Sequence, residues 1–93
     1  MSAAMPVMIV AEVPGHSRAG YDAMRLAMGE VLHRAPGLIL HTAHPVANGW
    51  RVVEVWETKR EADRFFVDEV VPRLPAGIHP RRSAVELHDV VSR

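Results

Sequence analysis

The chain of 93 residues contains no cysteine, which excludes disulfide bonds, thiolate metal sites and a cysteine nucleophile. It also lacks an excess of either charge, since eleven basic residues balance eleven acidic ones, so we expect no nucleic-acid or membrane partner. No apolar run approaches the roughly 18 residues of a membrane span, and the first residues make a poor signal peptide. These absences lead us to expect one cytoplasmic domain over residues 1–93.

The pattern of apolar residues predicts four strands and two helices in the order β-α-β-β-α-β. Strands are expected at 5–13, 38–44, 50–57 and 83–91, a helix at 18–35, and a second helix after Thr58 that kinks or ends at Pro72. Ser17 is the expected N-cap of the first helix, and Thr58 forms a capping box with Glu61. This order predicts a ferredoxin-like α+β fold, a four-stranded antiparallel sheet with two helices on one face. The first and third strands should be central, and Pro45 suits an edge position for the second.

The two central strands are apolar on both of their faces. In the third strand, the alternation of side chains puts both tryptophans on one face with Glu54 and two valines on the other. Two helices can cover only one face of such a sheet, so the other would expose a large apolar patch. We therefore expect a homodimer in which a second copy covers this face. Trp50, beside the hairpin turn, is expected at an edge or in the interface.

The second and third strands also carry the candidate catalytic residues. A tight turn centred on the Asn-Gly pair at 48–49 sets Ala43 opposite Glu54 and His41 opposite Trp56. His41, Glu54 and Trp56 then cluster, and a histidine beside a carboxylate can act as a general base or proton relay. The alternative is that His41 and Glu54 form a buried or interfacial hydrogen-bonded pair, with the indoles in the core. A register error of one residue would separate the cluster.

A second set of residues is predicted to bind a substrate: Tyr21, Met24, Met28, Phe65 and His88. Tyr21 begins the apolar stripe of the first helix, so its hydroxyl should reach a pocket between helix and sheet. The methionines would form an adaptable pocket wall. The alternatives are a tyrosine at the rim with a solvated hydroxyl, and methionines that serve only as core.

Six histidines raise the hypothesis of a metal site, but their spacing does not support one. His41 and His44 lie three positions apart on a strand and so face opposite sides, and His16 and His79 lie in expected loops. The sequence contains no glycine-rich phosphate loop, nucleophile elbow or nucleotide fingerprint. We therefore expect neither a metal nor an organic cofactor.

The stretch 36–72 resembles the dimeric α+β barrel superfamily, most of all the small proteins of the antibiotic-biosynthesis-monooxygenase (ABM) group. The shared features are P-G-L-x-x-H in the second strand, G-W-R-V-x-E-x-W-E in the third, Phe65-Phe66 and Pro72 after it, and V-x-x-H-x-V around His88. The likeness covers nearly the whole chain and implies a dimeric α+β barrel.

The superfamily includes cofactor-free oxygenases of polyketide quinones, haem-degrading enzymes, muconolactone isomerases and members without known activity. Its haem degraders carry a histidine about one helix length after the tryptophan matched by Trp56, and an asparagine on the first strand; residues 64–66 and 5–13 contain neither. The resemblance therefore implies a small-molecule-binding dimer that acts as a cofactor-independent monooxygenase, or an isomerase, on an aromatic or polyketide-type substrate. The alternative is a non-catalytic binding or stress-related dimer of the same fold.

Overall fold

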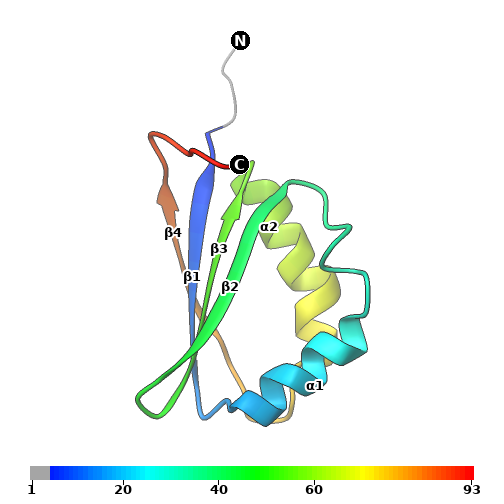
Figure 1. Cartoon of the computed structure of the whole chain (residues 1–93). Helices are drawn as coiled ribbons and strands as arrows, with labels where there is room; N and C mark the ends of the chain where they lie inside the picture. The colour runs from blue at the N-terminus through cyan, green and yellow to red at the C-terminus, as the bar shows by residue number, and fades with distance from the viewer. Residues whose placement is uncertain (1–4) are drawn as a thin grey trace.

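The computed structural model describes residues 5–93; residues 1–4 of the expected domain lie outside it. Its elements are β1 (Val7–Pro14), α1 (Arg18–Met28), β2 (Leu38–Val46), β3 (Gly49–Trp56), α2 (Lys59–Phe65), a π turn (Phe66–Val70), a 3₁₀ turn (Val71–Arg73) and β4 (Arg81–Glu86). The strands form one antiparallel sheet in the order β2-β3-β1-β4, and both helices lie on the same side of it (Figure 1). The predicted ferredoxin-like α+β fold is confirmed, with β2 at an edge.

Both helices begin at the predicted caps. The Ser17 hydroxyl oxygen accepts a hydrogen bond from the Gly20 N–H, and that of Thr58 accepts one from the Glu61 N–H, each at 3.1 Å. The Glu61 carboxylate in turn accepts a hydrogen bond from the Thr58 hydroxyl at 2.9 Å. These contacts satisfy N–H groups that a helix leaves without partners in its first turn.

The first helix is shorter than predicted, because α1 ends at Met28 and not at residue 35. Gly29 adopts a φ of 54°, and its N–H bonds to the carbonyls of Arg25 and Leu26. Glycine takes positive φ without steric cost, so it can stop a helix whose apolar pattern continues. The pattern itself was informative, since Leu32 is buried in the core although it lies outside the helix.

The last strand is also shorter than predicted, covering Arg81–Glu86 in place of 83–91. The Leu87 N–H still donates to the carbonyl of Pro6, at 2.8 Å. A proline has no N–H to continue the ladder with β4. Residues 87–91, including His88, therefore lie beyond the sheet.

The predicted register of the β2–β3 hairpin is wrong by two residues. Val46 pairs with Gly49, so the turn residues are Ala47 and Asn48, and His41 lies opposite Glu54. Gly49 belongs to the strand, where a Cβ would approach the Val13 carbonyl oxygen to 2.6 Å. Because side chains alternate with a period of two, an error of two leaves every residue on its predicted face.

Pro72 lies where the second helical segment ends, as predicted. α2 passes through the π turn of Phe66–Val70 into the 3₁₀ turn of Val71–Arg73 that contains this proline. A π turn widens the helix locally and is often found at functional sites. Among residues 5–93, no helix is long and apolar enough to cross a lipid bilayer.

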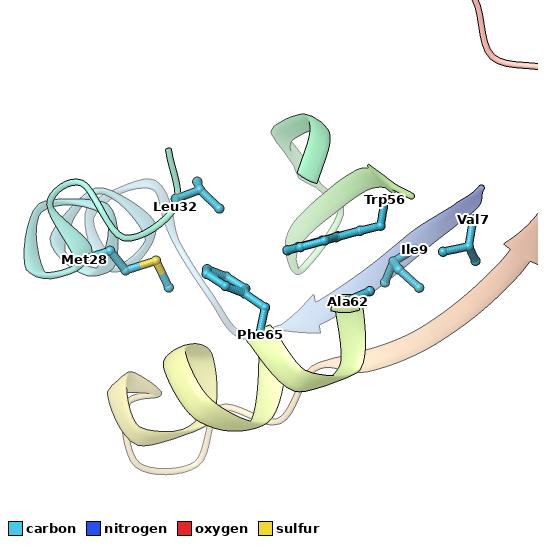
Figure 2. Close-up of a cluster of buried hydrophobic side chains, with 7 residues drawn as sticks. All are labelled: Val7, Ile9, Met28, Leu32, Trp56, Ala62 and Phe65. Atoms are coloured by element: carbon cyan, nitrogen blue, oxygen red, sulfur yellow. The ribbon is translucent and has the colours of Figure 1, made fainter. Parts of the chain in front are cut away.

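The core lies between the sheet and the two helices and centres on Trp56, whose exposed fraction is 0% (Figure 2). The Trp56 and Phe65 rings are tilted against each other with centroids 5.4 Å apart. The other buried members of this cluster are Val7, Ile9, Met28, Leu32 and Ala62. The face of β3 that carries the tryptophans is therefore the one that meets the helices. Trp50 is buried on this face, which corrects its expected place at an edge or in the interface.

Candidate functional site

A chain of three side-chain hydrogen bonds runs through the space between α1 and the sheet. The Tyr21 hydroxyl lies 2.6 Å from Nε2 of His41, and Nδ1 of His41 lies 2.6 Å from Oε2 of Glu54. The Trp56 indole N–H donates to the other carboxylate oxygen, Oε1, at 3.0 Å. His41 and Glu54 are largely buried, with side-chain exposures of 18% and 15%. Four residues singled out from the sequence thus form one connected polar group in an apolar setting.

Neighbouring strands and one helix position these groups. His41 of β2 pairs directly with Glu54 of β3, and Trp56 follows two residues later on the same face. Tyr21 comes from the first turns of α1, where its ring stacks on Trp50 with centroids 5.5 Å apart. The guanidinium of Arg18 also lies over the Trp50 ring, 5.8 Å from its centroid. Stacking and hydrogen bonding together hold the Tyr21 hydroxyl against His41.

The hydrogen-bond partners assign the protons of this chain. A carboxylate can only accept, so Nδ1 of His41 carries a proton and donates it to Glu54. In the neutral imidazole, Nε2 is then an acceptor, and the Tyr21 hydroxyl donates to it. This arrangement leaves His41 ready to take a proton that arrives through Tyr21, with the Glu54 carboxylate beside it to stabilise the imidazolium.

Burial raises the pKa of the Tyr21 hydroxyl above its usual value of 10.0. The negative charges of Glu54 and Asp22 raise it further, whereas the nearby Arg25 cation acts against this. Tyr21 therefore keeps its proton at neutral pH and serves as a donor to His41. Because the unfolded chain loses this proton first, the stability of the fold should decline as the pH rises above 10.

The ionisation of Tyr21 can be measured directly because it is the single tyrosine of the chain. We expect the phenolate absorbance near 295 nm to appear with a midpoint above pH 10. Tyr21→Phe should abolish this transition, which verifies the signal, and should weaken the loss of stability at alkaline pH. A midpoint at or below 10 in the folded protein would contradict the buried, hydrogen-bonded position of the hydroxyl.

Beside this chain lies a cavity of about 90 Å³ between the sheet and the helices. Its walls are mostly apolar and include Met24, Met28 and Phe65, three of the predicted substrate-binding residues. The polar side chains on its wall are His16, Tyr21, Arg25, His41, Glu54 and Arg82. An apolar cavity with a few converging polar groups is the usual form of a small-molecule site.

Two predicted site residues are not on the cavity wall. Trp56 does not line the cavity and is linked to it through its hydrogen bond to Glu54, so it acts as a positioning residue for that carboxylate. His88 is exposed beyond the end of β4, and the structure does not bring it to the cavity. We expected His88 on a strand face because the last strand was predicted to extend to residue 91, but β4 ends at Glu86.

Three polar residues of the wall were not predicted. Arg25 lies one helical turn after Tyr21, so helix periodicity could have placed it there. Arg82 of β4 pairs with Asp63 of α2 at 3.1 Å and lies over the ring of Phe66 in the π turn; no local sequence pattern signals these contacts. His16 follows β1 in a turn, and only the packing of α1 brings it to the cavity. Within residues 5–93, no group of three or more His, Asp or Glu side chains is placed to hold a metal ion.

The chain matches no family model and no curated protein. Solved structures do resemble it. SnoaB, a cofactor-independent oxygenase from Streptomyces nogalater, superposes with a TM-score of 0.69 at 16% identity, over 97% of this chain and 100% of that one. A monooxygenase of Streptomyces coelicolor in complex with nanaomycin D gives 0.54 at 22% identity, over 98% and 94%.

A haem-degrading protein from Mycobacterium tuberculosis, in its haem-free form, gives a TM-score of 0.58 at 21% identity, over 96% of this chain and 99% of that one. These structures share the fold of this chain over nearly its whole length. At such identities the likeness concerns the fold, so any activity has to be argued from the site itself.

Proposed function

We propose that this protein binds a small aromatic ligand in its cavity and oxygenates it without a cofactor. The observation that carries the proposal is the Tyr21–His41–Glu54 chain, which ends at the wall of an apolar cavity. The likeness in fold to a cofactor-independent oxygenase and to a monooxygenase with bound nanaomycin D supports it.

The chain of hydrogen bonds supplies a route for one proton. A ligand with an acidic C–H or O–H group gives its proton to the Tyr21 oxygen while the tyrosine proton moves to Nε2 of His41. Glu54 offsets the positive charge that forms on the imidazole, and the apolar walls keep water from the carbanion. The electron-rich ligand then reacts with dioxygen itself. For an anthrone, the ring CH₂ becomes a C=O, one oxygen atom enters the product, and the other leaves as water with the two hydrogens.

The alternative function is a non-catalytic binding dimer, and the size of the cavity favours it. Small-molecule sites usually hold about 300–1,000 Å³, whereas this cavity holds about 90 Å³. A polycyclic ligand therefore requires side chains to move, and Met24 and Met28 are the most adaptable members of the wall. In this alternative the Tyr21–His41–Glu54 chain serves packing alone.

Oxygen consumption with anthrone separates the two functions. For the catalytic protein we expect uptake of one dioxygen per anthrone, above the spontaneous rate, with anthraquinone and water as products. Protein dialysed against a metal chelator should retain full activity. If anthrone binds at the cavity but oxygen uptake is no faster than in buffer alone, the catalytic function is contradicted and the non-catalytic binding function is supported.

The proposed functional unit is a homodimer, because the face of the sheet away from the helices is apolar. The β1–β3 residue pairs Met8–Val55 and Val10–Val53 lie on it, and Leu40 at its edge is 54% exposed. A second copy packed on this face would bury these side chains and stabilise both protomers.

We expect sedimentation at micromolar concentration to give twice the mass of the chain. Val53→Arg should weaken the dimer by at least about 100-fold, because a charge would be buried without a partner. Leu26→Arg is the matched control, since Leu26 lies on α1 with 85% of its surface exposed. A wild-type protein that sediments only as a monomer would contradict the dimer.

A further inference from the structure

Three polar side chains on the cavity wall lie outside the Tyr21–His41–Glu54 chain, and His16 is the one that is not an arginine. His16 lies in the turn between β1 and α1, is only 9% exposed, and lines the same cavity. In the described part of the chain, the side-chain hydrogen bonds of histidines involve His41 and His44 and none involves His16. An imidazole on a cavity wall without a protein partner can offer a ring nitrogen to an occupant of that cavity.

The backbone of α1 makes room for this imidazole. A Cβ on Gly20 would lie 3.0 Å from Cε1 and 3.1 Å from Nδ1 of His16, tighter than ordinary side-chain contacts. Gly20 has no side chain, so the His16 ring can pack directly against the first turn of α1.

The surroundings of His16 also decide what it can bind. Burial lowers the pKa of its imidazole below 6.5, so the ring is uncharged at neutral pH. A neutral imidazole offers one N–H donor and one nitrogen acceptor. It suits an uncharged hydroxyl or carbonyl oxygen, either of which it can pair by choice of tautomer.

We propose that His16 is a ligand-binding residue that hydrogen-bonds a second oxygen of the aromatic ligand, while Tyr21 contacts the first. His16 directly precedes Ser17, the N-cap of α1, and Tyr21 lies in the first turns of this helix, so both residues reach the cavity wall from its N-terminal end. The ligand class that fits is an aromatic with oxygen substituents on two separate ring carbons, as in dihydroxynaphthalenes and hydroxyquinones. This inference rests on the proposed binding of an aromatic ligand and adds the identity of its substituents.

The test compares two probes that differ by one hydroxyl, 1-naphthol and 1,5-dihydroxynaphthalene, by calorimetric titration of the full-length protein. We expect the wild type to bind the dihydroxy compound about tenfold more tightly, the effect of one buried hydrogen bond. In His16→Phe the ratio of the two Kd values should fall to about one, because the hydrogen bond that separates the two probes is lost. Gly20→Ala, which pushes the ring away, should lower the ratio as well. His79→Phe, at an exposed loop histidine, should keep the wild-type ratio.

A second measurement needs no variant. The ring ¹⁵N resonances of His16 in the wild type should shift clearly more on addition of 1,5-dihydroxynaphthalene than with 1-naphthol, because only the first forms a hydrogen bond to the imidazole. Equal Kd ratios in wild type and His16→Phe, or an unmoved His16 resonance, would overturn the role of His16 and leave the binding of aromatics intact. If the wild type binds neither probe, the proposed aromatic ligand is itself contradicted.

Discussion

Replacing His41 by alanine is expected to slow anthrone oxygenation by about 10²–10⁴-fold, the usual contribution of a positioned general base. The imidazole is the group that takes the proton relayed through Tyr21, and the variant leaves nothing in its place. Oxygen uptake under saturating anthrone measures the effect on kcat, and binding of a non-reacting analogue should change little.

Two conservative variants locate the loss within the chain. Glu54→Gln keeps the shape of the side chain but removes the charge that stabilises imidazolium, and Tyr21→Phe removes only the hydroxyl. Both should lose most of the rate. His79→Ala is the matched control, because His79 is an exposed histidine in the loop before β4, away from the cavity wall. Equal rates in wild type, His41→Ala and Trp56→Phe would remove the assignment of this site.

The second large effect concerns stability. Trp56→Ala is expected to lower the free energy of unfolding by about 3–5 kcal/mol, because a fully buried indole leaves a cavity at the centre of the core. The total free energy of unfolding of a small domain is about 5–15 kcal/mol, so the variant should be close to unfolding at 37 °C. Urea denaturation followed by far-UV circular dichroism, at one fixed protein concentration, measures the change.

Trp56→Phe separates packing from hydrogen bonding. Phenylalanine keeps an aromatic ring beside Phe65 but removes the N–H that donates to Glu54, so we expect a smaller loss of about 1–2 kcal/mol. Leu26→Ala on the exposed side of α1 should change stability by less than about 0.5 kcal/mol. A Trp56→Ala protein as stable as Leu26→Ala would show that the indole is not part of the core.

The errors in the sequence-based prediction have specific physical causes. The length of the first helix was overestimated because the apolar periodicity of the sequence continues past Gly29, whereas the helical backbone ends there. The hairpin register was wrong because the Asn-Gly pair suggested its own turn, whereas Gly49 is required in the strand by the close approach of Val13. The error in the register did not change the predicted set of site residues, since a shift of two residues leaves every side chain on the same face of the sheet.

The sequence by itself determined the order of the elements and which side chains share a face of each strand. It thereby placed His41, Glu54 and Trp56 on the same face of the sheet. Alternation with a period of two is local, so it can be followed along the chain without knowing the fold. Only the tertiary structure decided that the Tyr21 hydroxyl meets His41, that His16 lines the cavity and that His88 does not. The contacts of Tyr21 and His16 depend on how α1 packs on the sheet, and the place of His88 depends on where the pairing of β4 with β1 ends. No local sequence pattern encodes that packing.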